Sequence, residues 1–282
     1  MFGHKLFQVL QKKFEVWATI RGNFDEIKNF KLFSKANIVN GVNVESYKTV
    51  KSAIEMIKPN VVINAVGIIK QLPTSKDVIK TLTINSIFPH RLAKLAQEFD
   101  FRVITVGTDC VFNGSKGNYR ENDVADAPDL YGKSKNFGEL IEKNCLTLRT
   151  SIIGRELNTA HSLVEWFLSN RGGKAKGFIN AIYSGFPTIV FADIIADLIE
   201  HQPKLEGLYH VSAEPVNKFE LLKLINKAYN ANIEIEPFED FYIDRSLNSD
   251  KFRAETGFNP KSWEEMIEIM AKDATPYENY RK

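Results

Sequence analysis

The chain has 282 residues, of which 44% are hydrophobic and 26% charged, and its formal net charge is +2. A chain of this length can bury a proper core in one large or two modest domains, and its small charge predicts no nucleic-acid partner. The two cysteines, Cys110 and Cys145, are too few for a disulfide framework and lack metal-ligand spacing, so we expect a reducing cytoplasm and no metal. We see neither a signal peptide nor an apolar run near the roughly 18 residues of a membrane helix, and expect no membrane contact.

The first half of the chain alternates helices and strands. A continuous apolar run over residues 61–66 is typical of a strand covered on both faces. Two of the expected helices cover residues 3–13 and 47–58. A third has Leu92, Leu95, Ala96 and Phe99 on one face. A fourth begins at Leu130 and directs Phe137, Leu140 and Ile141 inward. The other expected strands cover residues 14–20, 37–42, 103–106 and 146–151. This alternation predicts an α/β fold with a doubly wound, Rossmann-like parallel sheet over residues 1–153.

The alternation weakens after about Ile153. Asn217 with Glu220, and Ser262 with Glu265, have the spacing of helix capping boxes. The expected helices cover residues 161–169, 191–200 and 217–230 and a last segment from 262, and the expected strands cover 208–212 and 233–236. Residues 154–282 therefore predict a smaller α/β cap that binds substrate over the carboxyl ends of the sheet, with strands that can return to the main domain.

One stretch joins a strand end to reactive side chains. The strand over residues 103–106 is followed by Thr108, and a polar loop leads to a helix start that carries Tyr131 and Lys135 on one face. A phenol beside an ammonium, with a nearby hydroxyl, can move a proton onto a carbonyl oxygen, which is the chemistry of a reductase. Tyr-x-x-x-Lys arises about once by chance in such a chain, and a second copy at residues 47–51 fits an amphipathic surface helix. The structural alternatives are a core aromatic for Tyr131 and a backbone-bonding hydroxyl for Thr108.

Several runs resemble the dTDP-4-dehydrorhamnose reductase family of the extended short-chain dehydrogenase/reductase superfamily. Residues 107–114 (GTDCVFNG) are similar to the family's STDYVFDG, and residues 128–135 (PDLYGKSK) to its Pro-x-x-x-Tyr-Gly-x-(Ser/Thr)-Lys. Residues 148–151 (LRTS), 185–188, 207–211 and 257–260 follow in the family's order. The resemblance implies NADPH-dependent reduction of the 4-keto group of a nucleotide-linked 6-deoxy sugar, as in dTDP-rhamnose biosynthesis for cell-surface polysaccharide.

Within this resemblance, Tyr131 is the proton donor, Lys135 its partner and a ligand of the nicotinamide ribose, and Thr108 a hydrogen-bond partner of the substrate carbonyl. A free tyrosine titrates near 10, and lowering its pKa by ~3 units takes roughly 4 kcal/mol. A nearby ammonium and a nicotinamide cation can supply that stabilisation in a sheltered cleft.

The cofactor contacts that the resemblance implies are less specific. The turn over residues 64–67 resembles one that passes beside the cofactor, although small residues also suit close backbone packing. Arg21 follows the second strand of the fold, where a basic residue suits the 2′-phosphate of NADP, with NADH as the alternative cofactor. Asn85 matches the superfamily's helix asparagine or makes an ordinary polar contact. The expected cofactor residues are Gly3, Arg21, Asn64, Ala65, Val66, Gly67, Asn85, Tyr131 and Lys135.

The substrate contacts are assigned by family position and charge, and each of them could equally be a surface residue. The candidates for the nucleotide-sugar partner are Asp109, Arg149, Thr188, Arg245 and Lys251. The partners expected from the resemblance are this nucleotide sugar and a second copy in a homodimer, without a metal.

The main departure from the family lies at the start. The family opens with a strand and Gly-x-x-Gly-x-x-Gly, whose amides bind the cofactor pyrophosphate, and of these glycines the chain has only Gly3. We expect roughly ten further residues upstream, the length of one strand and its turn.

Two other functions stay open. A nucleotide-sugar epimerase or dehydratase of the same superfamily is one, although a dehydratase usually has an acidic pair after the threonine, where this chain has Asp109 and Cys110. A non-catalytic regulatory subunit, similar to the beta subunit of methionine adenosyltransferase, is the other.

Overall fold

The computed structural model describes residues 1–280. Its main sheet has four parallel strands in the order β10-β5-β4-β3. The strands are β3 (Val61–Asn64), β4 (Arg102–Val106), β5 (Cys145–Arg149) and β10 (Gly207–His210). The parallel sheet expected from the apolar runs is therefore confirmed, and β10 joins it from the second half of the chain.

A second sheet has two strands, and among the described residues no hydrogen-bonded ladder connects it to the main sheet. It pairs β1 (Ala18–Thr19) with β2 (Ile38–Val39) in parallel. Both strands are shorter than the segments of residues 14–20 and 37–42 predicted as strands. Within residues 1–280, no ladder joins β1 or β2 to β3, so β3 forms one edge of the main sheet.

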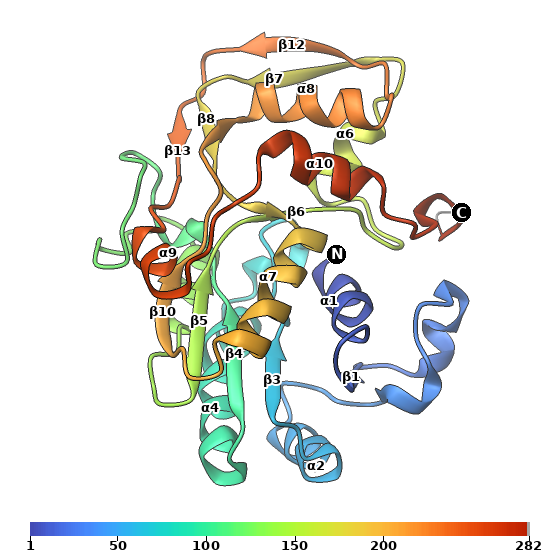
Figure 1. The fold of residues 1–282 in the computed structure, drawn as a ribbon, viewed down its shortest axis with the longest axis vertical. Coiled ribbons are helices and arrows are strands. Elements are labelled where there is room, and N and C mark those ends of the chain that lie inside the picture. Colours follow the sequence, from blue (N-terminus) through green and yellow to red (C-terminus); the bar gives the residue numbers. More distant parts are fainter. Residues whose placement is uncertain (281–282) are drawn as a thin grey trace.

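Helices cover both faces of the main sheet (Figure 1). α1 (Phe2–Leu10) and α7 (Thr188–His201) pack together on one face, in a core that includes Ile104 of β4. α2 (Tyr47–Ile57) and α4 (Phe88–Phe99) enclose Val103 on the other face. Ile104 and Val103 are both 0% exposed, because successive side chains of a strand point to opposite faces and both faces are covered.

The second half of the chain builds a smaller layer beyond the carboxyl ends of the main strands (Figure 1). β7 (Lys174–Phe178) pairs with β12 (Glu234–Phe238), and β8 (Ala181–Tyr183) pairs with β11 (Val216–Asn217) and β13 (Ile243–Asp244). The remaining short pair joins β6 (Ile152–Ile153) to β9 (Phe186–Pro187). Besides α7, the helices of this half are α6 (Leu163–Leu168), α8 (Lys218–Ala228), α9 (Asp250–Thr256) and α10 (Trp263–Ala271).

The predicted capping residues begin their helices. The Asn217 side chain accepts a hydrogen bond from the Glu220 amide at 2.8 Å at the start of α8. Ser262 and Glu265 form a reciprocal capping box at the start of α10, which buries Trp263 as expected. A side-chain acceptor at this position satisfies an amide that the helix cannot satisfy itself.

The prediction for the helix that carries Tyr131 is wrong at its C-terminal end. α5 (Leu130–Phe137) stops before Gly138, and Phe137 and Ile141 are 63% and 74% exposed, whereas Leu140 is buried. A Cβ atom on Gly138 would lie 1.9 Å from the Asn85 carbonyl oxygen, so this close approach requires a glycine at the residue where the helix ends. Only Leu140 of the three predicted core residues points inward.

Candidate active site

The carboxyl end of β4 leads into a tight turn that places Thr108 and Asp109. Thr108 caps a short 3-10 turn over residues 109–111, where its hydroxyl oxygen accepts from the Cys110 amide at 3.2 Å. Its hydroxyl also donates to the Asp109 carboxylate at 3.3 Å. Both side chains are buried, and this burial raises the pKa of Asp109 against the opposing effects of Arg245 and Lys218.

The N-terminus of α5 packs directly on this turn. Asp129 accepts a hydrogen bond from the Gly132 amide at 2.8 Å and thereby starts the helix. A Cβ atom on Gly132 would lie 2.2 Å from the Cys110 carbonyl oxygen and 2.4 Å from the Ala127 Cβ atom. The absence of a side chain at Gly132 therefore lets the helix approach the turn and brings Tyr131 to Thr108.

The Tyr131 hydroxyl lies close enough to Thr108 for that residue to lower the pKa of the phenol in this arrangement. Burial raises the pKa of the Tyr131 phenol, the neighbouring Cys110 thiol raises it further, and Thr108 opposes the change. In the chain itself, desolvation penalises the phenolate more than the chain's own polar groups stabilise it, whereas the lowered pKa expected from the resemblance includes the charge of a nicotinamide cation.

Lys135 points to the strand end rather than to the phenol. Its ammonium donates to the Val106 carbonyl at 2.7 Å. Burial lowers the pKa of Lys135 to about 8, and Glu139 acts in the opposite direction. Lys135 is thus fixed one helical turn beyond Tyr131 and near the same end of β4.

The predicted cofactor turn follows β3. The buried Asn64 side chain accepts from the Val66 amide at 3.2 Å, which shapes the turn and leaves Ala65, Val66 and Gly67 exposed. Asn85 lies in a π-helical segment over residues 83–87 and binds both the amide and the carbonyl of Ile68, at 2.8 and 3.0 Å. π-Helical turns occur frequently at functional sites.

Asn85 also joins this turn to α5. Its amide nitrogen donates to the Ser134 hydroxyl of α5 at 3.1 Å. The turn after β3 and the helix that carries Tyr131 and Lys135 are therefore held together by one buried side chain, which is 1% exposed.

The two remaining cofactor candidates lie elsewhere on the surface of the first half. Gly3 is exposed in the first turn of α1, with open space where a Cβ atom would lie. Arg21 is exposed just after β1, beside the small two-stranded sheet.

Of the basic substrate candidates, Arg245 reaches the turn after β4. Its guanidinium donates to the Phe112 carbonyl at 2.8 Å and lies 3.8 Å from the Cys110 sulfur. Arg245 follows β13 of the cap, so it links the second half of the chain to the Thr108 turn.

Three further substrate candidates, Arg149, Thr188 and Lys251, have other hydrogen-bond or packing partners. Arg149 forms a buried, two-pronged ion pair with Glu139, at 2.7 Å for both contacts. Thr188 is buried at the start of α7, where its hydroxyl takes up the space beside Gly154. Lys251 donates to the Leu208 carbonyl at 2.9 Å on the outer side of β10.

Sequence reasoning missed two basic residues of this region. Lys70 forms an ion pair with Asp129 at 2.6 Å, and its ammonium lies 5.6 Å from the centre of the Tyr131 ring. Burial lowers the pKa of Lys218, the first residue of α8, while Asp109 and Cys110 oppose that shift. Neither belongs to a motif, and only the adjacency of Lys70 to the residue 64–67 turn could have pointed to it.

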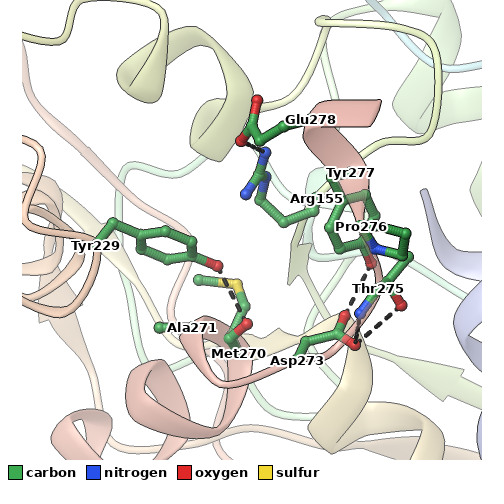
Figure 2. A pocket seen from close by; sticks show the side chains of 9 residues that line it. All are labelled: Arg155, Tyr229, Met270, Ala271, Asp273, Thr275, Pro276, Tyr277 and Glu278. Carbon is green, nitrogen blue, oxygen red and sulfur yellow. Dashed lines mark hydrogen bonds and ion pairs between the residues drawn. The ribbon is translucent and has the colours of Figure 1, made fainter. Parts of the chain in front are cut away.

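A cavity of about 120 Å³ lies elsewhere, between α10 and the C-terminal segment (Figure 2). Figure 2 shows Arg155 bound to Glu278 and the Tyr229 hydroxyl bound to the Met270 carbonyl around this space. None of the predicted site residues lines it. In residues 1–280 we find neither a cluster of three or more potential metal ligands nor a helix long and apolar enough to span a membrane.

A parallel sheet with helices on both faces, and with polar side chains gathered at its carboxyl ends, defines the Rossmann-like class of nucleotide-binding folds. The sequence profile of the RmlD substrate binding domain matches residues 2–275. The chain belongs to this family, and the family resemblance drawn from its motifs is confirmed.

The sequence identity between this chain and three curated relatives is 26–30% over the aligned residues. The chain is 30% identical over 183 residues to dTDP-4-dehydrorhamnose reductase from Aggregatibacter actinomycetemcomitans (62% of each chain), and 29% identical over 179 residues to the spore coat polysaccharide biosynthesis protein SpsK from Bacillus subtilis (61% of each). It is 26% identical over 202 residues to methionine adenosyltransferase 2 subunit beta from Xenopus laevis, with 67% of this chain and 60% of that protein covered. The chain thus spans about three fifths of these relatives' length.

Solved structures share the fold. A hypothetical dTDP-4-dehydrorhamnose reductase from Sulfolobus tokodaii superimposes with a TM-score of 0.75 at 23% identity, covering 93% of this chain and 94% of that one. The dTDP-4-dehydrorhamnose reductase of Bacillus anthracis in complex with NADP gives 0.74 at 22% identity, covering 92% and 99%.

Proposed function

We propose that this chain is a reductase that uses NADPH to reduce the 4-keto group of a nucleotide-linked 6-deoxy sugar. The observation that carries the proposal is the proximity of Thr108 to the Tyr131 phenol at the carboxyl end of β4, beside the turn after β3. The family membership and the NADP-bound relative support it. The division into a cofactor domain over residues 1–153 and a substrate cap over 154–282 is part of the proposal.

Three residues have separate roles in the proposed reaction. Thr108 donates a hydrogen bond to the substrate carbonyl oxygen, and Tyr131 delivers a proton to the same oxygen as the carbonyl carbon is reduced. Lys135 binds the ribose of the cofactor and places a positive charge near the phenol. When bound, the cofactor supplies the hydride.

The residues present fit a dinucleotide. Ala65, Val66 and Gly67 expose their backbone at the carboxyl end of β3, as a close approach to a cofactor requires. The exposed guanidinium of Arg21 suits the 2′-phosphate of NADPH, which makes NADPH the proposed cofactor and NADH the second choice. Gly3, Asn64 and Asn85 complete the proposed cofactor set.

The substrate is proposed to bind between the Thr108 turn and the cap. Arg245 lies at this junction and suits the diphosphate of a nucleotide sugar. Asp109, Arg149, Thr188 and Lys251 are the further proposed contacts. We place the reaction in the cytoplasm, in the synthesis of a cell-surface polysaccharide precursor, a role that the name of the SpsK relative supports. A homodimer is the proposed assembly.

The test is NADPH oxidation by the purified chain with dTDP-4-dehydro-6-deoxy sugar as substrate, followed by absorbance. We expect turnover that falls by at least about 100-fold in Tyr131→Phe, the range that a positioned proton donor contributes. No turnover above the rate without enzyme, for thymidine- and uridine-linked 4-keto sugars alike, would refute the proposal.

Two alternatives have support of their own. The likeness to methionine adenosyltransferase 2 subunit beta favours a regulatory subunit, which predicts binding to a methionine adenosyltransferase catalytic subunit and no NADPH oxidation. A dehydratase or epimerase of the superfamily would instead change a nucleotide sugar without net NADPH consumption.

A further inference from the structure

Lys70 lies against the face of Tyr131. Its ammonium nitrogen is 5.6 Å from the centre of the phenol ring and 2.6 Å from the Asp129 carboxylate. A cation over an aromatic face at this distance is attracted by the ring. Tyr131 is therefore approached by a lysine from the segment after β3, whereas Lys135 on its own helix is directed to the Val106 carbonyl.

The backbone around Lys70 is fixed by neighbouring side chains. The Ser75 hydroxyl donates to the Lys70 carbonyl at 3.1 Å, and Asn85 binds both polar backbone groups of Ile68. The side chain of Lys70 thus extends toward α5 from a held turn.

Asp129 connects this contact to the start of the catalytic helix. One carboxylate oxygen accepts from the Gly132 amide at 2.8 Å, and the other accepts from Lys70. Although burial acts in the opposite direction, these bonds and the nearby Arg245 keep the pKa of Asp129 below its usual value. The pair joins the turn after β3 to the first turn of α5.

We propose that Lys70, held by Asp129, is a positioning residue for Tyr131 that places an ammonium beside the phenol and offsets the negative charge of Asp129. This inference rests on the proposed reductase function. In this proposal, the Lys70–Asp129 ion pair, which lies outside the Tyr-x-x-x-Lys motif, helps to set the acidity of the Tyr131 phenol.

Several groups that face Tyr131 raise the pKa of its phenol. Asp109 and Cys110 from the turn after β4, and Asp129 from the helix start, all raise the pKa of the phenol. Lys135 is turned to the Val106 carbonyl, and the cap residues Arg245 and Lys218 act on Asp109. Lys70 is the cation that lies on the ring itself.

The ion pair contributes little to stability. The Lys70 and Asp129 side chains are 35% and 40% exposed, and solvent screens the attraction between exposed ionic groups. Substitution of Lys70 should therefore leave the fold intact and change the chemistry at Tyr131.

The test compares Lys70→Met with Lys116→Met. Lys116 is a matched control, because it also lies 5.6 Å from the centre of a tyrosine ring, that of Tyr119, and pairs with Asp123 at 2.7 Å. In the reductase assay, we expect Lys70→Met to shift the alkaline limb of kcat/KM upward by roughly 0.5–1 pH unit and to lower kcat about 3- to 10-fold. Lys70→Arg should retain the wild-type profile, and Lys116→Met should leave it unchanged.

The inference is overturned if Lys70→Met keeps the profile of Lys116→Met, or if Lys70→Arg loses activity as Lys70→Met does. A second measurement needs no substrate: the Cζ signal of Tyr131 in ¹³C-tyrosine-labelled protein, assigned by its loss in Tyr131→Phe, is followed with rising pH. We expect the signal to begin titrating at higher pH in Lys70→Met than in Lys116→Met. Equal titration refutes the inference, whereas a wild-type chain without reductase activity refutes the proposed function alone.

Discussion

Gly132 lies so close to Cys110 that a Cβ atom on the glycine would be 2.2 Å from the cysteine's carbonyl oxygen. This contact seats α5 on the Thr108 turn. We expect Gly132→Ala to push the helix away, to lower kcat by more than about tenfold, and to destabilise the protein by about 1–3 kcal/mol, as overpacking does. Activity and urea denaturation measure both effects.

Gly173→Ala is the matched control, since the nearest atom to its added Cβ atom would be the Asn170 carbonyl oxygen at 3.3 Å. It should change neither kcat nor stability by a comparable amount. Equal effects of the two substitutions would show that the Gly132 contact has no special importance.

Asn85 supports the cofactor turn by three hydrogen bonds, two to Ile68 and one to Ser134. Asn85→Ala leaves buried polar groups without partners, which costs about 1–3 kcal/mol for each such group. We expect a loss of roughly 2–4 kcal/mol in the free energy of unfolding and weaker NADPH binding by fluorescence titration. Asn180→Ala, which removes one exposed bond to the Glu239 carbonyl, should do neither, and an Asn85→Ala protein with wild-type stability would contradict the role.

Lys135 should make stability depend on pH. Its pKa is about 8 in the folded chain against 10.5 for the free side chain, so between these values the unfolded state binds more protons. The free energy of unfolding therefore rises with pH from about 8 to 10.5, by up to about 3 kcal/mol. Denaturation of wild type and Lys135→Met across this range should show a smaller rise in the variant, and parallel curves would show that the lysine titrates normally.

Substitution of Arg149 can distinguish a structural role of this residue from a role in substrate binding. Its buried pair with Glu139 predicts that Arg149→Met, which leaves that carboxylate buried and unpaired, destabilises the protein by about 3–5 kcal/mol. The double variant Arg149→Met/Glu139→Gln should recover much of the loss in thermal or chemical denaturation. A variant that is as stable as wild type but has a raised KM would instead assign Arg149 to the substrate.

The parts of the fold that follow from local chemistry could be predicted from the sequence. The apolar run at residues 61–66 predicts a strand of a parallel sheet, and the parallel pairing of β3 with β4 confirms this part of the sheet. Ser262 and Glu265 predict a helix start, and the capping box is present. In each case, the residues that decide the structure are neighbours in the chain.

Features that depend on distant contacts could not be predicted. Phe137 and Ile141 have the spacing of a buried helix face, but α5 ends at Phe137 and both side chains are exposed. The place of Lys70 beside Tyr131 is set by tertiary packing, which no spacing in the sequence reveals. Charge alone likewise could not tell Arg245, at the Thr108 turn, from Lys251 on the outer side of β10.

The central claim is that the phenol of Tyr131 protonates a ketone while NADPH reduces it. The most direct test is transfer of deuterium from [4-²H]NADPH to C4 of a dTDP-4-keto-6-deoxy sugar, measured by mass spectrometry with wild type and Tyr131→Phe. We expect deuterium in the wild-type product, formed at least about 100-fold faster than with the variant. Deuterium-free sugar from the wild type, or equal transfer by both proteins, would contradict the account.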